Sequence, residues 1–174
     1  MYPLHVTQLA PHPSLDIAIG LARVPMEASL KVMSMADAEL PLGATVLVFG
    51  YAHSTFEEHA SDCRLLGGSG LLGLTSNIIC AFHLGAVDGY YPDGFSLLKG
   101  QPSFVHTAET LGAQSGGPIL DEAQRLVYGV TSTGSEQYGV AVDIRAIFDW
   151  RIPFLERYSL RDLANLGFVR VRVP

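Results

Sequence analysis

The sequence has little cysteine and little charge. Cys63 and Cys80 are the two cysteines in 174 residues, too few for the disulfide framework that stabilises small secreted domains. We expect buried free thiols, with a single bridge between the two as the alternative. Charged residues make up 16% of the chain against 48% hydrophobic residues, a balance that indicates a globular chain and excludes a disordered one.

Basic residues are also scarce. Eleven Lys and Arg stand against 17 Asp and Glu, and the net charge of −6 argues against a nucleic-acid partner. No run approaches the roughly 20 apolar residues that span a membrane, so no membrane partner is expected. The opening residues MYPLH lack the basic and apolar regions of a secretory signal, which favours a cytoplasmic location. Six arginines fall between Arg145 and Arg172, where we expect a solvated face.

Glycine and proline punctuate short apolar runs along most of the chain, a rhythm that predicts an all-β barrel or sandwich. The C-terminal part differs, because Asp143 can cap a helix from 143 to 158 that Pro153 would kink or end early. A short helix at 160–166 and an alternating strand at 168–173 complete the prediction. The predicted strands of the β region are 16–24, 44–50, 71–74, 77–84, 103–107, 117–120, 126–132 and 138–142.

One motif carries chemistry. Residues 112–120 read GAQSGGPIL and place Ser115 among glycines at the entrance to an apolar strand. Small residues there let a carbonyl group approach the hydroxyl and free backbone N–H groups to face an oxyanion. The alternative is an ordinary turn serine in a glycine-rich hairpin.

A second motif lies upstream, where Asp16 opens the sequence DIAI after His12-Pro13. With GATVLVFGY at 43–51, the Ser115 motif, VYGVTS at 127–132 and YGVAV at 138–142, the chain resembles the trypsin-like serine peptidases of the chymotrypsin fold. It is nearest to their bacterial glutamyl-endopeptidase and HtrA-type branches. The resemblance implies an all-β double barrel with an incomplete first barrel, plus a C-terminal helix and terminal strand. It implies a remnant of the first barrel at 1–40, a complete second barrel at 41–143, and a C-terminal helical segment and strand at 144–174.

The resemblance also implies roles for single residues. Ser115 would be the nucleophile and Asp16 the carboxylate that orients a histidine, with no metal or other cofactor. Alternatively, Asp16 is a strand-edge or capping residue. Glu109 stands where the trypsin branch has an acidic residue that selects basic substrates, or it is a solvated loop charge. The oxyanion hole would lie at Ala113, Gln114 and Ser115, and the substrate pocket would be walled by Glu109, Thr110, Leu111, Thr131, Ser132, Thr133 and Gly134.

Two departures from the family pattern stand out. Only fifteen residues precede Asp16, so the N-terminal segment that carries the family's histidine is expected to be absent from this chain. His5 is too close to Asp16, and His12 matches the His-Pro pair upstream of the family's aspartate. Ala113 replaces a glycine, so either the loop is shifted by one residue or the oxyanion hole is malformed. The other four histidines, His53, His59, His83 and His106, align with the second barrel.

These departures leave two functions open. One is a serine endopeptidase, inactive as this chain stands unless a histidine is supplied. The other is a catalytically dead domain that binds peptides or proteins, or that forms one half of a split peptidase. An incomplete barrel exposes strand edges and apolar surface, so we expect self-association or a partner chain that completes it.

Overall fold

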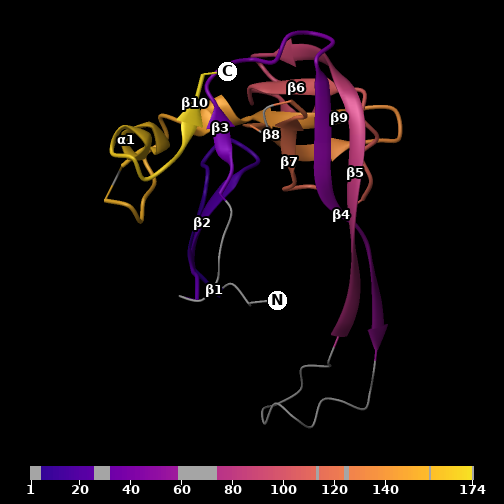
Figure 1. The fold of residues 1–174 in the computed structure, drawn as a ribbon, viewed down its shortest axis with the longest axis horizontal. Helices are drawn as coiled ribbons and strands as arrows, with labels where there is room; N and C mark the ends of the chain where they lie inside the picture. Colours follow the sequence, from indigo (N-terminus) through magenta and orange to yellow (C-terminus); the bar gives the residue numbers. More distant parts are fainter. Residues whose placement is uncertain are drawn as a thin grey trace.

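The computed structural model describes residues 5–25, 32–58, 74–112, 114–123, 126–156 and 158–173, and over 51–58 and 74–81 it describes the backbone alone. Within these ranges the regular secondary structure is predominantly β, as predicted (Figure 1). Ala113, His59, Cys63 and most of the strand predicted at 71–74 lie outside the described residues. So do the side chains of His53 and Cys80.

Six strands close into a barrel, because β8 pairs with both β7 and β9. The order around the barrel is β4-β5-β6-β9-β8-β7, and every pairing in it is antiparallel. Two further strands extend the sheet, since β3 pairs parallel with β8 and β10 pairs parallel with β3. The bounds are β3 Ser34–Ala36, β4 Thr45–Glu58, β5 Leu74–Tyr91, β6 Ser103–His106, β7 Pro118–Asp121, β8 Leu126–Gly134, β9 Gly139–Asp143 and β10 Val171–Arg172.

A separate two-stranded sheet precedes the barrel. β1 (His5–Pro11) pairs antiparallel with β2 (Ala18–Arg23). The sequence did not predict β1, because Ala10 is the one buried residue among its seven and the strand therefore shows no apolar alternation. Figure 1 shows this hairpin standing apart from the barrel.

The long strand β5 differs from its prediction. We expected a strand to end near Leu84 in a turn-rich stretch, but β5 runs unbroken to Tyr91. Its glycines serve close packing instead of turns: a Cβ on Gly85 would lie 2.1 Å from the backbone nitrogen of Ala108. β4 and β5 extend together away from the barrel in Figure 1.

The helix predicted at 143–158 is wrong. A short 3-10 helix, η3 (Ile144–Ile147), follows Asp143, whose side chain accepts from the backbone N–H of Arg145. Turns then lead to α1 (Leu160–Asn165), which confirms the second predicted helix and starts with a capping box between Ser159 and Asp162. The predicted strand at 168–173 is reduced to β10, because only two residues find partners on β3.

Three hydrophobic clusters hold these parts together: a small one of Leu98, Val105, Val140 and Val142, and two larger cores. One fills the barrel, with Val46, Val48 and Phe104 fully buried. The other is built around η3 and α1, and it includes Leu15 and Ile17 from the β1–β2 connection. The chain bends at this point, and the N–H of Ile17 donates to the carbonyl of Leu15 at 2.8 Å across the intervening Asp16. The members of the second core are Ile144, Ile147, Phe148, Ile152 and Leu160, with partly buried Leu15, Ile17, Ile19, Met35, Val130, Trp150, Phe154, Leu155, Leu163, Val169 and Val171.

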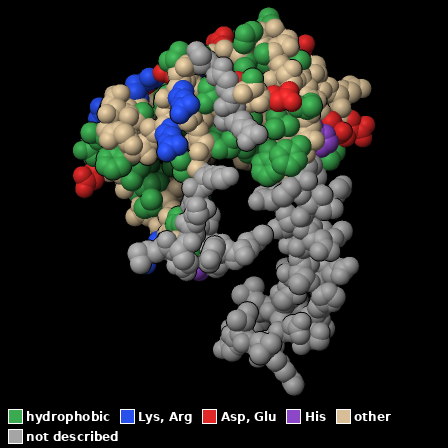
Figure 2. Space-filling model, in the orientation of Figure 1, with side chains coloured by type: hydrophobic (Ala, Val, Ile, Leu, Met, Phe, Trp, Pro, Cys, Tyr) green, Lys and Arg blue, Asp and Glu red, His purple; other side chains and the backbone are tan. Residues whose placement is uncertain are grey.

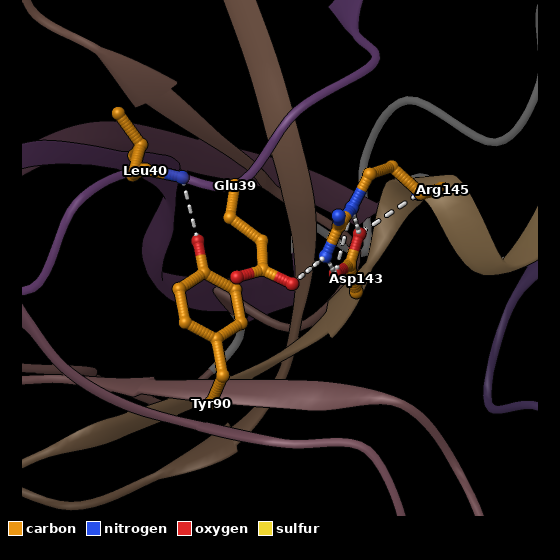
Figure 3. A network of polar contacts seen from close by, with 5 residues as sticks. All are labelled: Glu39, Leu40, Tyr90, Asp143 and Arg145. Atoms are coloured by element: carbon orange, nitrogen blue, oxygen red, sulfur yellow. Dashed lines mark hydrogen bonds and ion pairs between the residues drawn. The ribbon is translucent and has the colours of Figure 1, made fainter.

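A polar network ties the segment before β4 to the end of β9 (Figure 3). The guanidinium of Arg145 donates to the buried carboxylate of Asp143 through Nε and Nη2, and Nη2 also donates to Glu39 at 2.8 Å. The hydroxyl of Tyr90 accepts from the backbone N–H of Leu40 at 2.8 Å, and burial raises the pKa of Tyr90 to about 12. The network therefore fixes the start of η3.

Basic side chains gather on one part of the visible surface. Figure 2 shows Lys and Arg side chains gathered over α1 and β10, where the sequence concentrates its arginines. No helix in the described ranges has the length and hydrophobicity needed to cross a membrane.

Candidate active site

Folding brings Asp16 and Ser115 to the same place, although 99 residues separate them (115 − 16). Ser132 on β8 joins the two. Its hydroxyl donates to the carboxylate of Asp16, and its backbone carbonyl accepts from the hydroxyl of Ser115 at 2.8 Å. A carboxylate and a hydroxyl are thus held on either side of one serine.

The Asp16–Ser115 cleft lies between these two residues. We use this name for a cavity of about 670 Å³ that both residues line. Wall residues such as Ile17 and Ile144 are apolar, whereas Asp16 and Ser115 are themselves exposed to solvent. The full lining is Pro11, Leu15, Asp16, Ile17, Ala18, Ser115, Gly116, Val130, Thr131, Ile144 and Ile147.

The loop that carries Asp16 is held from several sides. The Nδ1 atom of His12 accepts from the backbone N–H groups of Ser14 and Leu15 at 3.2 and 3.1 Å. The His12 ring packs edge-on against Trp150, with centroids 4.8 Å apart, and burial lowers the pKa of His12. The backbone N–H of Asp16 donates to the side chain of Gln101 at 2.5 Å. His12 therefore shapes the loop before the aspartate, and its Nδ1 is already occupied.

No histidine side chain that the structure describes hydrogen-bonds to Asp16 or Ser115. His5 pairs with Arg23 at one end of the β1–β2 hairpin, whereas Asp16 lies at the other end, beyond the Pro11–Ala18 pair. His83 instead pairs with Glu109, with 3.3 Å between Nδ1 and the carboxylate oxygen. The described hydroxyl that bonds to the Asp16 carboxylate is that of Ser132.

The glycines after Ser115 are required by geometry. Gly116 has φ +87°, a conformation that side chains disfavour, and its N–H donates to the carbonyl of Thr131 at 2.7 Å. A Cβ on Gly117 would lie 2.0 Å from the backbone oxygen of Phe49 on β4. The Ser-Gly-Gly sequence therefore lets the serine turn lie directly on the barrel wall.

Gln114 closes the loop before the serine. Its side-chain oxygen accepts from the backbone N–H of Leu111 at 2.7 Å, and its own N–H donates to the Leu111 carbonyl at 3.3 Å. The N–H of Ser115 makes no hydrogen bond to any described residue. Because Ala113 lies outside the described residues, the oxyanion hole at Ala113, Gln114 and Ser115 stays a prediction.

The predicted pocket walls meet at the end of β8. Thr131 is fully buried, and Ser132, Thr133 and Gly134 continue the strand. Thr110 lies against Gly134, because a Cβ on that glycine would be 2.6 Å from the Thr110 Cβ. The carboxylate of Glu109 is engaged with His83.

Sequence reasoning missed two contributors. It assigned Ser132 to the pocket wall but not to Asp16, and it gave no role to Gln101, 85 residues from Asp16. For Ser132 the sequence did hold a signal, because the resemblance places this residue in the wall of the substrate pocket. Nothing in the sequence around Gln101 points to Asp16. Among the side chains that the structure describes, no cluster of three metal-ligating groups occurs.

Comparison with known proteins supports the fold. No protein-family model and no curated protein matches this sequence. The chain is similar to the inactive form of the Rv3671c protease, with TM-score 0.56 and 18% identity over 95% of this chain and 68% of that one. The active form, from M. tuberculosis, gives 0.58 and 17% over 98% and 62%. A mutant of human heparin-binding protein gives 0.54 and 11% over 93% and 66%.

These similarities define the fold class. The chain has the all-β, chymotrypsin-like fold of the trypsin-like serine peptidases. It spans about two thirds of the length of these solved structures, between 62% and 68%. At identities of 11–18% the likeness establishes the fold alone.

Proposed function

We propose that this chain is the catalytic part of a trypsin-like serine endopeptidase, nearest to the bacterial glutamyl-endopeptidase and HtrA-type branches. The observation that carries the proposal is the bridge through Ser132, which holds the Asp16 carboxylate and the Ser115 hydroxyl in one cleft. If Ser115 were an ordinary turn serine and Asp16 a capping residue, nothing would require two residues 99 positions apart (115 − 16) to line one cleft.

The proposed reaction is acyl transfer. The Ser115 oxygen adds to the peptide carbonyl carbon while its proton passes to an imidazole, and the resulting oxyanion is held by backbone N–H groups of Ala113 and Ser115. The imidazolium then gives its proton to the leaving amine as the peptide C–N bond breaks. Water, deprotonated by the same imidazole, hydrolyses the acyl-serine and restores the hydroxyl. Asp16 orients the imidazole and stabilises its charged form.

The substrate would bind along β8. On the edge of β8 that faces away from β9, Thr131 makes two hydrogen bonds to the serine turn. Its N–H donates to the carbonyl of Gly117, and its carbonyl accepts from the N–H of Gly116. Among the described residues, no backbone hydrogen bond continues that side at Thr133 and Gly134, which leaves an open strand edge next to Ser115. An extended peptide can pair with such an edge and present its carbonyl to the nucleophile.

The imidazole would come from a further polypeptide segment. The Asp16–Ser115 cleft has room for it, and the β1–β2 hairpin offers open edges with Val6 and Leu9 about two-thirds exposed. We infer that a second copy or a partner chain completes the first barrel here and supplies the histidine. Static light scattering tests this: a dimer or hetero-complex is expected, and a monomer at all concentrations, with or without candidate partners, would contradict it.

One observation favours the alternative, a non-catalytic peptide-binding domain. The Ser115 hydroxyl donates to the Ser132 carbonyl, an arrangement that does not activate an oxygen. In this alternative the β8 edge binds peptide and no covalent step follows.

A fluorophosphonate probe separates the two functions. The probe reacts only with an activated serine, so we expect an adduct on Ser115, detected by mass spectrometry, when free imidazole is added to occupy the cleft. Ser115→Ala should remove the adduct and Asp16→Asn should reduce it strongly. Asp93→Asn, at an exposed turn, is the matched control and should label normally. Absence of any adduct over hours in imidazole would favour the binding domain.

A further inference from the structure

Gln101 holds the backbone of Asp16 from a distant part of the chain. Its side-chain oxygen accepts from the N–H of Asp16 at 2.5 Å, although 85 residues separate the two. The other N–H groups of the bend at 12–17 are used inside the bend, two of them by the ring of His12, and Pro13 has none. The Asp16 N–H is therefore the amide of this bend whose described partner lies on another element.

The segment that carries Gln101 is itself well held. It follows η2 (Ser96–Leu98), and Leu98 is buried in a cluster with side chains of β6 and β9. The N–H of Gln101 donates to the carbonyl of Leu98 at 3.0 Å. The carbonyl of the next residue, Pro102, accepts from the N–H of Asp143 at 2.9 Å. Because the backbone around Gln101 is fixed in this way, its side chain reaches Asp16 from a rigid base.

Asp16 is thus held at two points. Gln101 binds its backbone N–H, and the hydroxyl of Ser132 donates to its carboxylate. The three residues line one cavity of about 510 Å³. An aspartate side chain has two rotatable bonds, so fixing the backbone at one end and a carboxylate oxygen at the other leaves the second oxygen little freedom. The direction of the carboxylate therefore depends on both contacts.

The contact with Gln101 is not required for folding. Asp16 is exposed, so water can bond to its N–H when Gln101 does not. A hydrogen bond between exposed groups replaces bonds to water and contributes little to the free energy of unfolding. Water is not tied to the barrel, however, and cannot fix the direction of the carboxylate. We therefore expect the contact to affect the geometry of the site more than the stability of the chain.

We propose, resting on the proposed function, that Gln101 is a positioning residue for the reaction at Ser115. By fixing the backbone of Asp16, it holds the carboxylate in the direction that an imidazole in the Asp16–Ser115 cleft requires. The imidazole then donates its N–H to Asp16 and turns its other nitrogen toward the Ser115 hydroxyl. Gln101 acts through Asp16 and takes no part in the proton transfers.

Binding of imidazole tests the proposal without any covalent step. Imidazole and 1-methylimidazole are titrated into the protein at a pH where both are neutral, and the backbone amides of Asp16 and Ser132 are followed by NMR. Only imidazole can donate to Asp16 while it keeps a nitrogen for Ser115. We expect the native protein to bind imidazole roughly three- to tenfold more tightly than 1-methylimidazole, which is the contribution of one hydrogen bond.

Matched variants separate positioning from folding. Gln101→Met keeps the length of the side chain without the accepting oxygen and should remove most of the imidazole preference. Gln101→Glu keeps an accepting oxygen and should restore the preference. Gln137→Met, in the exposed bend between β8 and β9, is the control and should behave like the native protein.

Two further measurements accompany the titrations. Urea unfolding should give the same stability for the native protein and Gln101→Met. Hydrogen exchange at the Asp16 amide should be roughly three- to tenfold faster in Gln101→Met, because this amide loses its protein partner.

Three results would overturn the proposal. One is an equal imidazole preference in the native protein and Gln101→Met, or no preference in either. Another is an unchanged exchange rate at the Asp16 amide, which would show that the bond does not form in solution. The third is a lost preference accompanied by a loss of stability, which would assign Gln101 to folding.

The probe reaction at Ser115 decides the proposed function separately. Failed labelling with an imidazole preference that depends on Gln101 would reject the peptidase and keep the positioning of Asp16. Labelling with equal preferences in the native protein and Gln101→Met would keep the peptidase and reject the role of Gln101.

Discussion

His106 should make the fold sensitive to acid. It is enclosed by the barrel with its ring 6.3 Å from that of Phe104, and burial lowers the pKa of His106 from 6.5 to about 4. The folded protein therefore keeps the ring neutral at a pH where the unfolded chain protonates it. Above pH 6.5 the free energy of unfolding is unaffected by this residue, and it decreases as the pH falls from 6.5 toward 4.

The size of the effect follows from the two pKa values. At pH 7 both states are mostly neutral and the residue costs almost nothing. At pH 5 the unfolded chain is protonated and the folded one is not, which lowers the free energy of unfolding by about 2 kcal/mol relative to pH 7. His106→Leu removes this contribution, and at pH 7 it should cost little because it also removes two unpaired buried nitrogens.

Urea unfolding at pH 7 and pH 5, followed by circular dichroism, measures this difference. Fluorescence is less suitable, because protonation of His12 beside Trp150 would change the signal. The native protein should lose about 2 kcal/mol more than His106→Leu between the two pH values. Other groups titrate equally in both proteins and cancel in the comparison. Equal losses would refute the reasoning and show that the ring is solvated or already paired.

Five further substitutions, two of them controls, test the fold. Arg145→Met leaves the buried carboxylate of Asp143 without its partner and should lower the free energy of unfolding by about 2–3 kcal/mol. Arg161→Met breaks more exposed ion pairs and should lower it by under about 1 kcal/mol. Urea titration measures both changes. Gly117→Ala collides with the barrel wall and should abolish probe labelling of Ser115, while Gly112→Ala meets no atom within 4 Å and should label normally. Ser159→Ala removes the cap of α1 and should cost about 1 kcal/mol in the same titration.

The strands of the barrel could be predicted because their apolar residues alternate or run together between turn signals. The predictions failed where burial did not follow such a pattern. β1 exposes nearly all its side chains, and Gly85 in β5 resembles a turn residue although it serves a close contact with Ala108. The helix predicted from 143 had a cap and apolar spacing, but tertiary packing of Ile144 and Ile147 stopped it after one turn. Local propensity could not reveal that packing.

The candidate site shows the same limit at longer range. Ser115 and Asp16 carry motifs of their own, so their types and order were enough to pair them. The residues that position them lie on other elements: Gln101 follows η2 (Ser96–Leu98), and Ser132 lies within β8. Such partners emerge only when the barrel closes.

Closure of the barrel also determines how the site can bind an imidazole and a substrate. The barrel places Ser132 between the carboxylate and the hydroxyl, and the same strand continues to Gly134 beside Thr110. One strand therefore connects the position where an imidazole would bind to the position where a substrate side chain would enter. An imidazole brought into the Asp16–Ser115 cleft would compete with the Ser132 carbonyl for the Ser115 hydroxyl. That carbonyl would then be free to accept the N–H of a bound peptide, so completing the cleft and opening the strand edge to substrate would be a single event.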